Sequence, residues 1–177
     1  MDEEVMTVGV IQAPDQAQID RLDRMVQQYE KDLLRLCCLY LRDWNAAEDV
    51  VQETFLKAFR HLDSFREESS EKTWLITIAL NGCRDYRRSA WFRYIDSRVS
   101  LNDLPASSEP PDSEHVELTL AIMQLKPKYM EAVLLYFYEG YSMKEIGEML
   151  NITEAAVSDR IRKAKQKLKQ ELEGGRA

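Results

Sequence analysis

The residues with the clearest chemical pattern are the cations and short polar side chains of the stretch 154–169. With about 100° between successive residues around a helix axis, Val157, Ile161, Ala164 and Leu168 share one side, which predicts a core face. The remaining face and its flanks carry Ala155, Ser158, Asp159, Arg160, Arg162, Lys163, Lys165 and Gln166. Such a surface suits the major groove of DNA, where some side chains meet base edges and others meet phosphates. A solvated basic surface helix in a bundle would show the same pattern.

The residues before this stretch have the end signals of a helix-turn-helix. Ser142 followed by Glu145 is a capping box that starts a first helix. Asn151 tolerates the left-handed conformation that a tight turn requires, and Thr153 can cap the second helix. Gly147 is unfavourable inside a helix, which indicates that it lets the second helix cross the first closely. The pattern predicts two steeply crossed helices joined by a short turn.

An acidic surface is predicted on a helix that runs from about residue 45 to residue 61, with Asn45 as its N-cap. The inward side of this helix holds Val51, Phe55, Ala58 and Leu62. The opposite stripe consists of Asp49, Gln52, Glu53, Leu56 and Arg60. An outward Leu among carboxylates and an amide is unusual for a face in water. It is either a single exposed Leu, which needs no special explanation, or part of a docking surface for a basic partner.

A third surface pattern combines aromatic rings with arginines. A helix is predicted from about residue 71 to residue 89, capped by Ser69 or Ser70, after a polar loop with one aromatic side chain. The loop and one stripe of the helix together supply Phe65, Trp74, Asn81, Arg84 and Arg88. Rings, an amide and guanidinium groups in line suit unstacked bases and their phosphates. The alternative is an ion-paired surface, because Asp85 lies near both Asn81 and Arg88.

The order of these patterns predicts an all-α protein of two helical domains joined by a flexible linker, the C-terminal one a helix-turn-helix. Strict period-two alternation is absent, which excludes a mainly β fold. Residues 1–15 look irregular, and a long helical pattern runs from about residue 16 to residue 42. The first domain spans 16–95, and the Pro- and Ser-rich stretch 96–113 is the linker. The second domain spans 114–172, with helices at 116–125 and 130–139, Pro127 as a first helical residue and Gly140 as a stop.

The charge distribution is polarised although the net charge is −7. Acidic residues concentrate in the first third, and basic residues concentrate in 84–98 and 160–169, which is compatible with DNA on one side and a protein partner elsewhere. The three cysteines lack metal-ligand spacing and indicate buried thiols in a reducing cytoplasm. No apolar run has the length of a signal or membrane segment. His61 and His115 are isolated from any nucleophile, so we expect neither an enzyme nor a metal or other cofactor.

Three segments together resemble a bacterial RNA polymerase sigma factor of the extracytoplasmic-function (ECF) group. They read A-A-E-D-V-V-Q-E-T-F-L-K-A-F (46–59), T-W-L-I-T-I-A-L-N-G-C-R-D-Y-R-R (73–88) and L-K-P-K-Y-M-E-A-V-L-L-Y-F-Y-E-G-Y-S-M-K-E-I-G-E-M-L (125–150). The resemblance implies that the acidic stripe binds core polymerase at the β′ clamp, with a further contact at the β flap. It implies that the aromatic-arginine stripe captures an unpaired base of the −10 element, and that the helix-turn-helix reads the −35 element. It also implies an anti-sigma partner.

The chain departs from the family pattern in the second helix of the helix-turn-helix. Ala156, Ser158 and Asp159 stand where the family usually carries Thr, Lys and Ser, so the −35 sequence is not predictable. Gly147 replaces a usual Ala, a change expected to have little effect. Two other functions remain open: a stand-alone helix-turn-helix regulator of duplex DNA, and a helical adaptor without a DNA role. The first leaves the acidic and aromatic-arginine stripes unexplained, and the basic final helix argues against the second.

Overall fold

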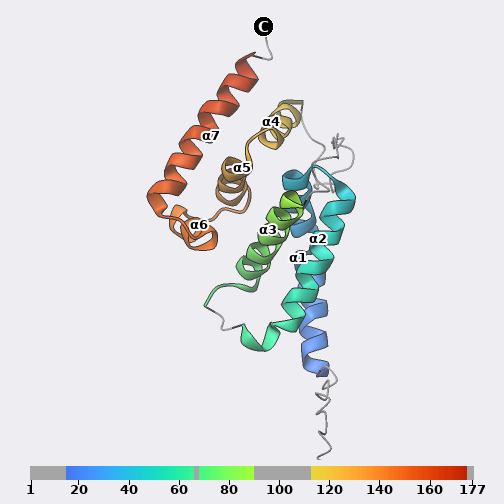
Figure 1. Cartoon of the computed structure of the whole chain (residues 1–177). Coiled ribbons are helices and arrows are strands. Elements are labelled where there is room, and N and C mark those ends of the chain that lie inside the picture. The colour runs from blue at the N-terminus through green and yellow to red at the C-terminus, as the bar shows by residue number, and fades with distance from the viewer. Residues whose placement is uncertain (1–14, 66–67, 90–112, 175–177) are drawn as a thin grey trace, which may run out of the picture.

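Every regular element that the computed structural model describes is helical, in residues 15–65, 68–89 and 113–174 (Figure 1). The all-α prediction is therefore confirmed. The α-helices are α1 (Gln16–Leu41), α2 (Trp44–Arg60), α3 (Glu71–Arg88), α4 (Ser113–Met123), α5 (Pro127–Val133), α6 (Met143–Leu150) and α7 (Glu154–Gly174). A 3-10 turn, Leu62–Ser64, follows α2, and a π-helical turn, Leu134–Tyr138, extends α5.

The first unit packs α1, α2 and α3 against one another around a buried apolar core. The N-cap of α2 is Asp43 and not Asn45, because the Asp43 side chain accepts a 3.0 Å hydrogen bond from the Ala46 backbone N–H. The predicted cap at Asn45 was therefore wrong by two residues. Ser70 caps α3 as predicted, since its Oγ accepts from the Thr73 N–H at 3.1 Å.

The second unit consists of α4 to α7, and Pro127 is the first residue of α5 as predicted. The helix after Pro127 does not stay α-helical. Its last turn widens, with the Glu139 N–H donating to the Leu134 carbonyl at 3.0 Å, a spacing of five residues that the sequence pattern did not predict. Gly140 then ends the helix with a φ of 75°, where a residue without a Cβ is favoured.

The local chemistry of the helix-turn-helix is as the sequence predicts. The Ser142 N–H donates to Glu145 Oε2 at 2.8 Å, and the Glu145 N–H donates back to Ser142 Oγ at 3.3 Å. Asn151 adopts a left-handed φ of 53°, and Thr153 Oγ1 caps α7 by accepting from the Ala156 N–H at 3.2 Å.

Gly147 has the packing reason that the sequence suggested. A Cβ on Gly147 would lie 2.8 Å from the carbonyl oxygen of Ile152, in the turn that leads into α7. An alanine here would displace backbone, so the expectation that Ala and Gly are nearly equivalent at this position was wrong for this chain.

The two units lie against each other, and their buried residues form one contiguous cluster. Contacts join α1 to α5 and α3 to α6, and Figure 1 shows α5 and α6 on the side that α3 faces. The predicted linker 96–113 lies outside the described residues except for Ser113, which opens α4. The predicted irregular segment 1–15 also lies outside them, except for Asp15.

Candidate functional site

The acidic stripe of α2 forms one solvent-exposed face. All five predicted residues are exposed: Asp49, Gln52, Glu53, Leu56 and Arg60. The Leu56 side chain is 50% exposed, whereas its neighbour Phe55 is 7% exposed. The carboxylate of Glu53 lies 3.8 Å from Lys57 Nζ, in an exposed pair one helical turn apart. The helix therefore presents an apolar side chain among acids, as predicted.

The two aromatic residues of the third pattern come together although nine positions separate them. Phe65 and Trp74 stack with ring centroids 4.6 Å apart and an interplanar angle of 23°. The guanidinium carbon of Arg21 lies 5.6 Å from the centroid of the Phe65 ring. Phe65 is half-buried, and Trp74 packs partly against the core. The Phe65 ring is thus stacked on Trp74 and also contacted by the cation of Arg21.

The polar members of the same pattern are paired within the chain. Arg88 Nη2 donates to Asp85 Oδ1 at 2.7 Å, and Arg84 Nη1 donates to Asn81 Oδ1 at 2.9 Å. The ion-paired surface considered as an alternative is therefore present in this state. Asn81 and Arg88 remain exposed, with the Arg88 side chain 76% accessible, so a weak surface pair is all that a nucleic acid would have to displace there.

The outward face of α7 centres on one acid held by two cations. Arg162 Nη2 lies 2.6 Å from Asp159 Oδ1, and Lys163 Nζ lies 2.7 Å from Asp159 Oδ2. Hydrogen bonds from Lys163 and then from Arg162 hold the pKa of Asp159 below its ordinary value. Ala155, Ser158 and Gln166 are exposed on the same helix. Asp159 therefore positions the two cations and offsets part of their charge.

Two of the predicted α7 residues point elsewhere. Arg160 Nη1 lies 4.0 Å from Glu131 Oε2, and the Arg160 side chain is 24% exposed. Lys165 Nζ lies 5.1 Å from the centroid of the Phe137 ring, whose residue is 52% exposed. The structure thus groups Arg162 and Lys163 around Asp159 but directs Arg160 and Lys165 toward α5 and its π-helical extension.

Glu131 is a central residue that the sequence reasoning missed. It lies on α5 and is 4% exposed, with partners from both units. Tyr40 donates to its Oε1 at 2.8 Å, and Arg84 reaches both of its oxygens. Burial, and then the charge of Glu131, raises the pKa of the Tyr40 phenol far above its ordinary value, so this hydroxyl stays a donor. The signal was a lone acid in the apolar run 129–138, because a buried carboxylate requires partners.

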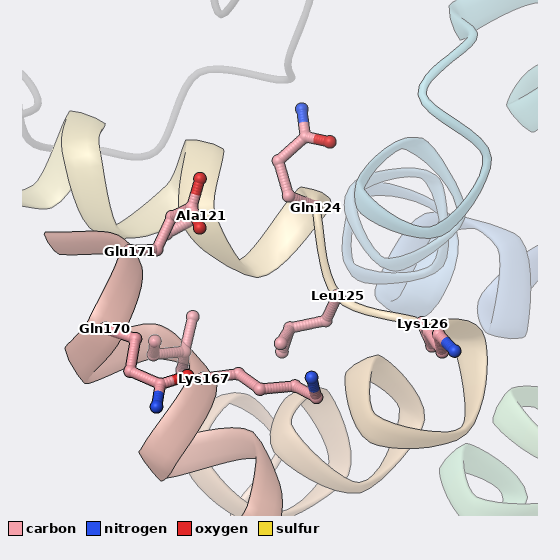
Figure 2. Close-up of a pocket in the computed structure, with 8 residues that line it drawn as sticks. Ala121, Gln124, Leu125, Lys126, Lys167, Gln170 and Glu171 are labelled. Atoms are coloured by element: carbon pink, nitrogen blue, oxygen red, sulfur yellow. The ribbon is translucent and has the colours of Figure 1, made fainter. Parts of the chain in front are cut away.

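A shallow groove of about 230 Å³ lies between α4 and α7, and it was not predicted either. Figure 2 shows Leu125 reaching into this space from the chain after α4, while Lys167 crosses it from α7. The lining also includes Ala121, Gln124, Lys126, Leu168, Gln170 and Glu171. Its polar side chains are therefore two lysines, two glutamines and one glutamate.

Within the described ranges, no group of three His, Cys, Asp or Glu side chains could hold a metal ion. The three cysteines, Cys37, Cys38 and Cys83, are buried free thiols. Of the helices in those same ranges, none is both long enough and apolar enough to span a membrane.

Comparisons with known proteins agree on one family. The model described as Sigma-70 region 2 matches residues 25–93, and the model described as Sigma-70, region 4 matches residues 115–168. The chain is 31% identical over 152 residues to the ECF RNA polymerase sigma factor SigM of Bacillus subtilis, which covers 84% of this chain and 93% of that protein. It is 36% identical over 137 residues to the RNA polymerase sigma factor CarQ of Myxococcus xanthus, covering 75% and 78%.

Two solved structures share the fold. One is the sigma factor RpoE in complex with the anti-sigma factor NepR from Bartonella quintana, with a TM-score of 0.71 and 22% identity over 87% of this chain and 98% of that chain. The other is CnrH in complex with the cytosolic domain of CnrY, with a TM-score of 0.66 and 24% identity over 88% and 90%. At these identities the likeness supports the helical arrangement alone.

Proposed function

Because this chain belongs to the family of ECF RNA polymerase sigma factors, we propose that its three surface patterns divide the work of promoter recognition. The protein is an alternative sigma factor that binds core RNA polymerase and directs it to specific promoters. The first unit, which includes α2 and α3, holds core polymerase and the −10 element, and α7 of the second unit reads the −35 element. The observation that carries this division is the exposed Leu56 within the acidic face of α2, since a DNA-binding module alone has no use for that face.

The acidic stripe is suited to a basic helical partner, and we assign it to the β′ clamp. Leu56 supplies apolar contact at the centre, while Asp49 and Glu53 supply charge that steers and orients the partner. The rim charges are exposed, so we expect them to affect association rate and salt dependence more than residence time. A further contact at the β flap is proposed for the second unit, without a residue assignment.

The aromatic-arginine stripe is assigned to the −10 element. Phe65 presents an aromatic ring that is already supported by Trp74, so a flipped-out base could stack without ordering a loose side chain. Base capture offsets an unstacking cost of a few kcal/mol. Asn81, Arg84 and Arg88 would meet the strand that leaves the duplex, with the arginines changing partners from carboxylates to phosphates. The chemistry of RNA synthesis stays with core polymerase, so we infer that this protein is not itself an enzyme.

The outward face of α7 is assigned to the −35 element as duplex DNA. Arg162 and Lys163 share Asp159, and that acid restricts both to one region of the face. A carboxylate in a DNA-facing position repels phosphate and accepts from the amino group of cytosine. We therefore propose that Asp159 discriminates among bases, in place of the donors that the family usually carries nearby.

The cellular setting follows from the partners. We propose that the protein acts in the cytoplasm, where core polymerase is found, and that an anti-sigma factor holds it inactive until a stress or envelope signal arrives. The sigma factor RpoE of Bartonella quintana, which has the same helical arrangement, was solved in complex with an anti-sigma factor, and this motivates the proposed regulation.

Reconstitution with core polymerase tests the proposal. The full chain should co-purify with core enzyme, and the holoenzyme should start transcription at a subset of genomic promoter fragments. The stand-alone regulator predicts specific duplex binding by the protein without core and no promoter-dependent transcript. Failure to associate with core polymerase would exclude a sigma factor function, and an adaptor would bind neither core nor DNA.

A further inference from the structure

One stripe of α1 contacts the chain on both sides of the Phe65 ring. Gln18 Nε2 donates a 2.5 Å hydrogen bond to Asp63 Oδ1, in the 3-10 turn just before Phe65. Arg21 Nε donates to Glu71 Oε1 at 2.9 Å, at the first residue of α3. Gln18 and Arg21 are three positions apart on α1 and are therefore neighbours on its surface. Figure 1 shows the N-terminal half of α1 beside the turn that follows α2.

The Glu71 carboxylate is shared by two guanidinium groups of α1. Arg21 Nη2 lies 2.8 Å from Glu71 Oε1, and Arg24 donates to Oε1 at 3.2 Å and to Oε2 at 3.3 Å. The Glu71 side chain is 16% exposed, against 29% for Arg21 and 56% for Arg24. Burial by itself would raise the pKa of Glu71, but the hydrogen bonds from Arg21 and Arg24 outweigh it and hold that pKa below its ordinary value. The acid is therefore charged at neutral pH and holds Arg21 through a charge-assisted hydrogen bond.

Arg21 also contacts the aromatic ring itself. Its guanidinium carbon lies 5.6 Å from the centroid of the Phe65 ring, within the range of a cation–π contact. The same ring stacks on Trp74 of α3, with the two centroids 4.6 Å apart. Phe65 is half-buried and follows the 3-10 turn rather than lying within an α-helix. Contacts from two different helices, α1 and α3, therefore determine how this ring is oriented.

We propose that Arg21 is a positioning residue for base capture at the −10 element. Held by Glu71, it keeps the Phe65 ring in the orientation that receives an unpaired base, and it does not itself touch DNA. A side chain that is already oriented loses less conformational entropy when it binds, which is the step that Arg21 assists. The inference rests on the proposed function, since it adds a residue of α1 to the −10 site assigned to α3 and the loop before it.

Two other roles for Arg21 lead to different experimental results. If Arg21 binds a DNA phosphate directly, its effect does not depend on the Phe65 ring, and Glu71 opposes it by neutralising its charge. If the pair of Arg21 with Glu71 only stabilises the fold, promoter opening by folded protein does not depend on the pair. A positioning role requires that Arg21 act through Phe65 and that Glu71 assist it.

The experiment follows opening of a promoter fragment that the wild-type holoenzyme transcribes, and it measures closed-complex affinity separately from opening rate. Arg21→Ala should slow opening roughly fivefold, because capture must then order the ring. It should change closed-complex affinity less than about twofold, since no phosphate contact is lost. The double variant Arg21→Ala with Phe65→Ala should open at the rate of Phe65→Ala alone, because no ring is left to position. The control Lys31→Ala removes a cation from another exposed position of α1 and should leave both quantities unchanged.

Glu71→Gln supplies a second readout, and the sign of its effect separates the roles. The substitution keeps the shape of the side chain and removes the charge that holds Arg21. A positioning role predicts opening that is slower by roughly threefold. A phosphate contact predicts faster opening, because a carboxylate that repels DNA would be lost. The matched control is Glu30→Gln, which removes the same charge from an exposed position of α1 and should have no effect.

Circular dichroism and urea unfolding show whether each variant folds, and Glu71→Gln decides the matter should Arg21→Ala lose helical signal. Three results would each overturn the positioning role: normal opening by folded Arg21→Ala, a further loss in the double variant beyond Phe65→Ala, or faster opening by Glu71→Gln. Normal opening by Phe65→Ala would instead overturn the assignment of the −10 site. A wild-type protein that does not bind core polymerase would overturn the proposed function as a whole.

Discussion

The rings of Phe65 and Trp74 stack with their centroids 4.6 Å apart, which joins the loop after α2 to the first turn of α3. This relationship gives the loop ring a fixed orientation before any DNA arrives. A base that stacks on it would meet a preorganised surface, and preorganisation reduces the entropy cost of capture.

Phe65→Ala should therefore impair promoter opening while leaving the core complex intact. Stacking on an aromatic side chain contributes about 1–3 kcal/mol per base, so we expect opening to fall by one to two orders of magnitude. Permanganate reactivity of unpaired thymines measures it. A template with a pre-melted −10 bubble should partly rescue the variant, and a normal opening signal on intact duplex would show that the ring only supports the loop.

The exposed polar residues of α3 should affect the same step. Asn81→Ala and Arg88→Ala holoenzymes should bind closed promoter DNA but open it poorly, because both side chains are exposed on the stripe of α3 that begins at Trp74. Asp85→Asn is the matched control, since it breaks the Arg88 ion pair without removing the cation. If both alanine variants open promoters normally, the stripe serves only as an ion-paired surface.

The acidic stripe of α2 can be tested by charge reversal on one helix. Glu53→Lys should weaken association with core polymerase, because Glu53 lies beside Leu56 on the exposed face. Glu48→Lys makes the same change on α2 at an exposed position outside the stripe and should have little effect. Neither substitution touches the core, so helical circular dichroism should stay unchanged. Equal core binding by the two variants in a pull-down titration would reject this assignment.

The outward face of α7 predicts a split between specificity and affinity. Arg162→Ala should flatten preference at one or two −35 positions, since a bidentate arginine contact to guanine contributes about 1–3 kcal/mol of discrimination. Lys165 lies on the flank of α7, near the Phe137 ring, and is exposed. Lys165→Ala should therefore weaken all sequences alike and lower the salt slope by about one. Holoenzyme binding to a library of −35 variants at two salt concentrations distinguishes the two outcomes. Identical sequence profiles for Arg162→Ala and wild type would make Arg162 a phosphate contact.

The close approach at Gly147 predicts a loss of stability from a substitution that helix propensity favours. Gly147→Ala should lower the free energy of unfolding by about 1–3 kcal/mol, the usual cost of overpacking, because its Cβ would meet the Ile152 carbonyl. Gly174→Ala, at the open end of α7, should be neutral or slightly stabilising. Urea unfolding followed by circular dichroism measures both. A stability gain at position 147 would show that the turn yields without cost.

Most of this fold could be predicted from the sequence because helix caps and helical periodicity act within a few residues. Ser142, Asn151 and Thr153 act on backbone groups within a few residues of themselves, so their caps were predicted correctly. Asp43 and Asn45 are both suitable N-cap residues for α2, and the direction of the chain at the end of α1 decides which of them caps the helix. The period of 3.6 residues placed Leu56 outward and Phe55 inward with no further information.

The candidate sites were predictable as surfaces but not as contacts. Periodicity put Arg84 and Arg160 outside the cores of their own helices, yet it says nothing about which other helix each side chain will contact. The hydrogen bonds of Glu131 reach residues 91 positions away, at Tyr40, and 47 positions away, at Arg84, so they depend on how the units pack. The stacking of Phe65 on Trp74 likewise depends on the path of the loop between α2 and α3.

The π-helical turn at Leu134–Tyr138 determines how α6 and α7 are oriented relative to α5. One extra residue in a helical turn rotates the next element by about 100°, and here Tyr138 meets Arg35 while Phe137 lies under Lys165. A chimaera that grafts only 141–174 onto another protein's scaffold would therefore keep α7, the helix we propose to contact the −35 element, but would change its orientation. The graft should begin at Lys126, so that the wide turn travels with the helices it orients.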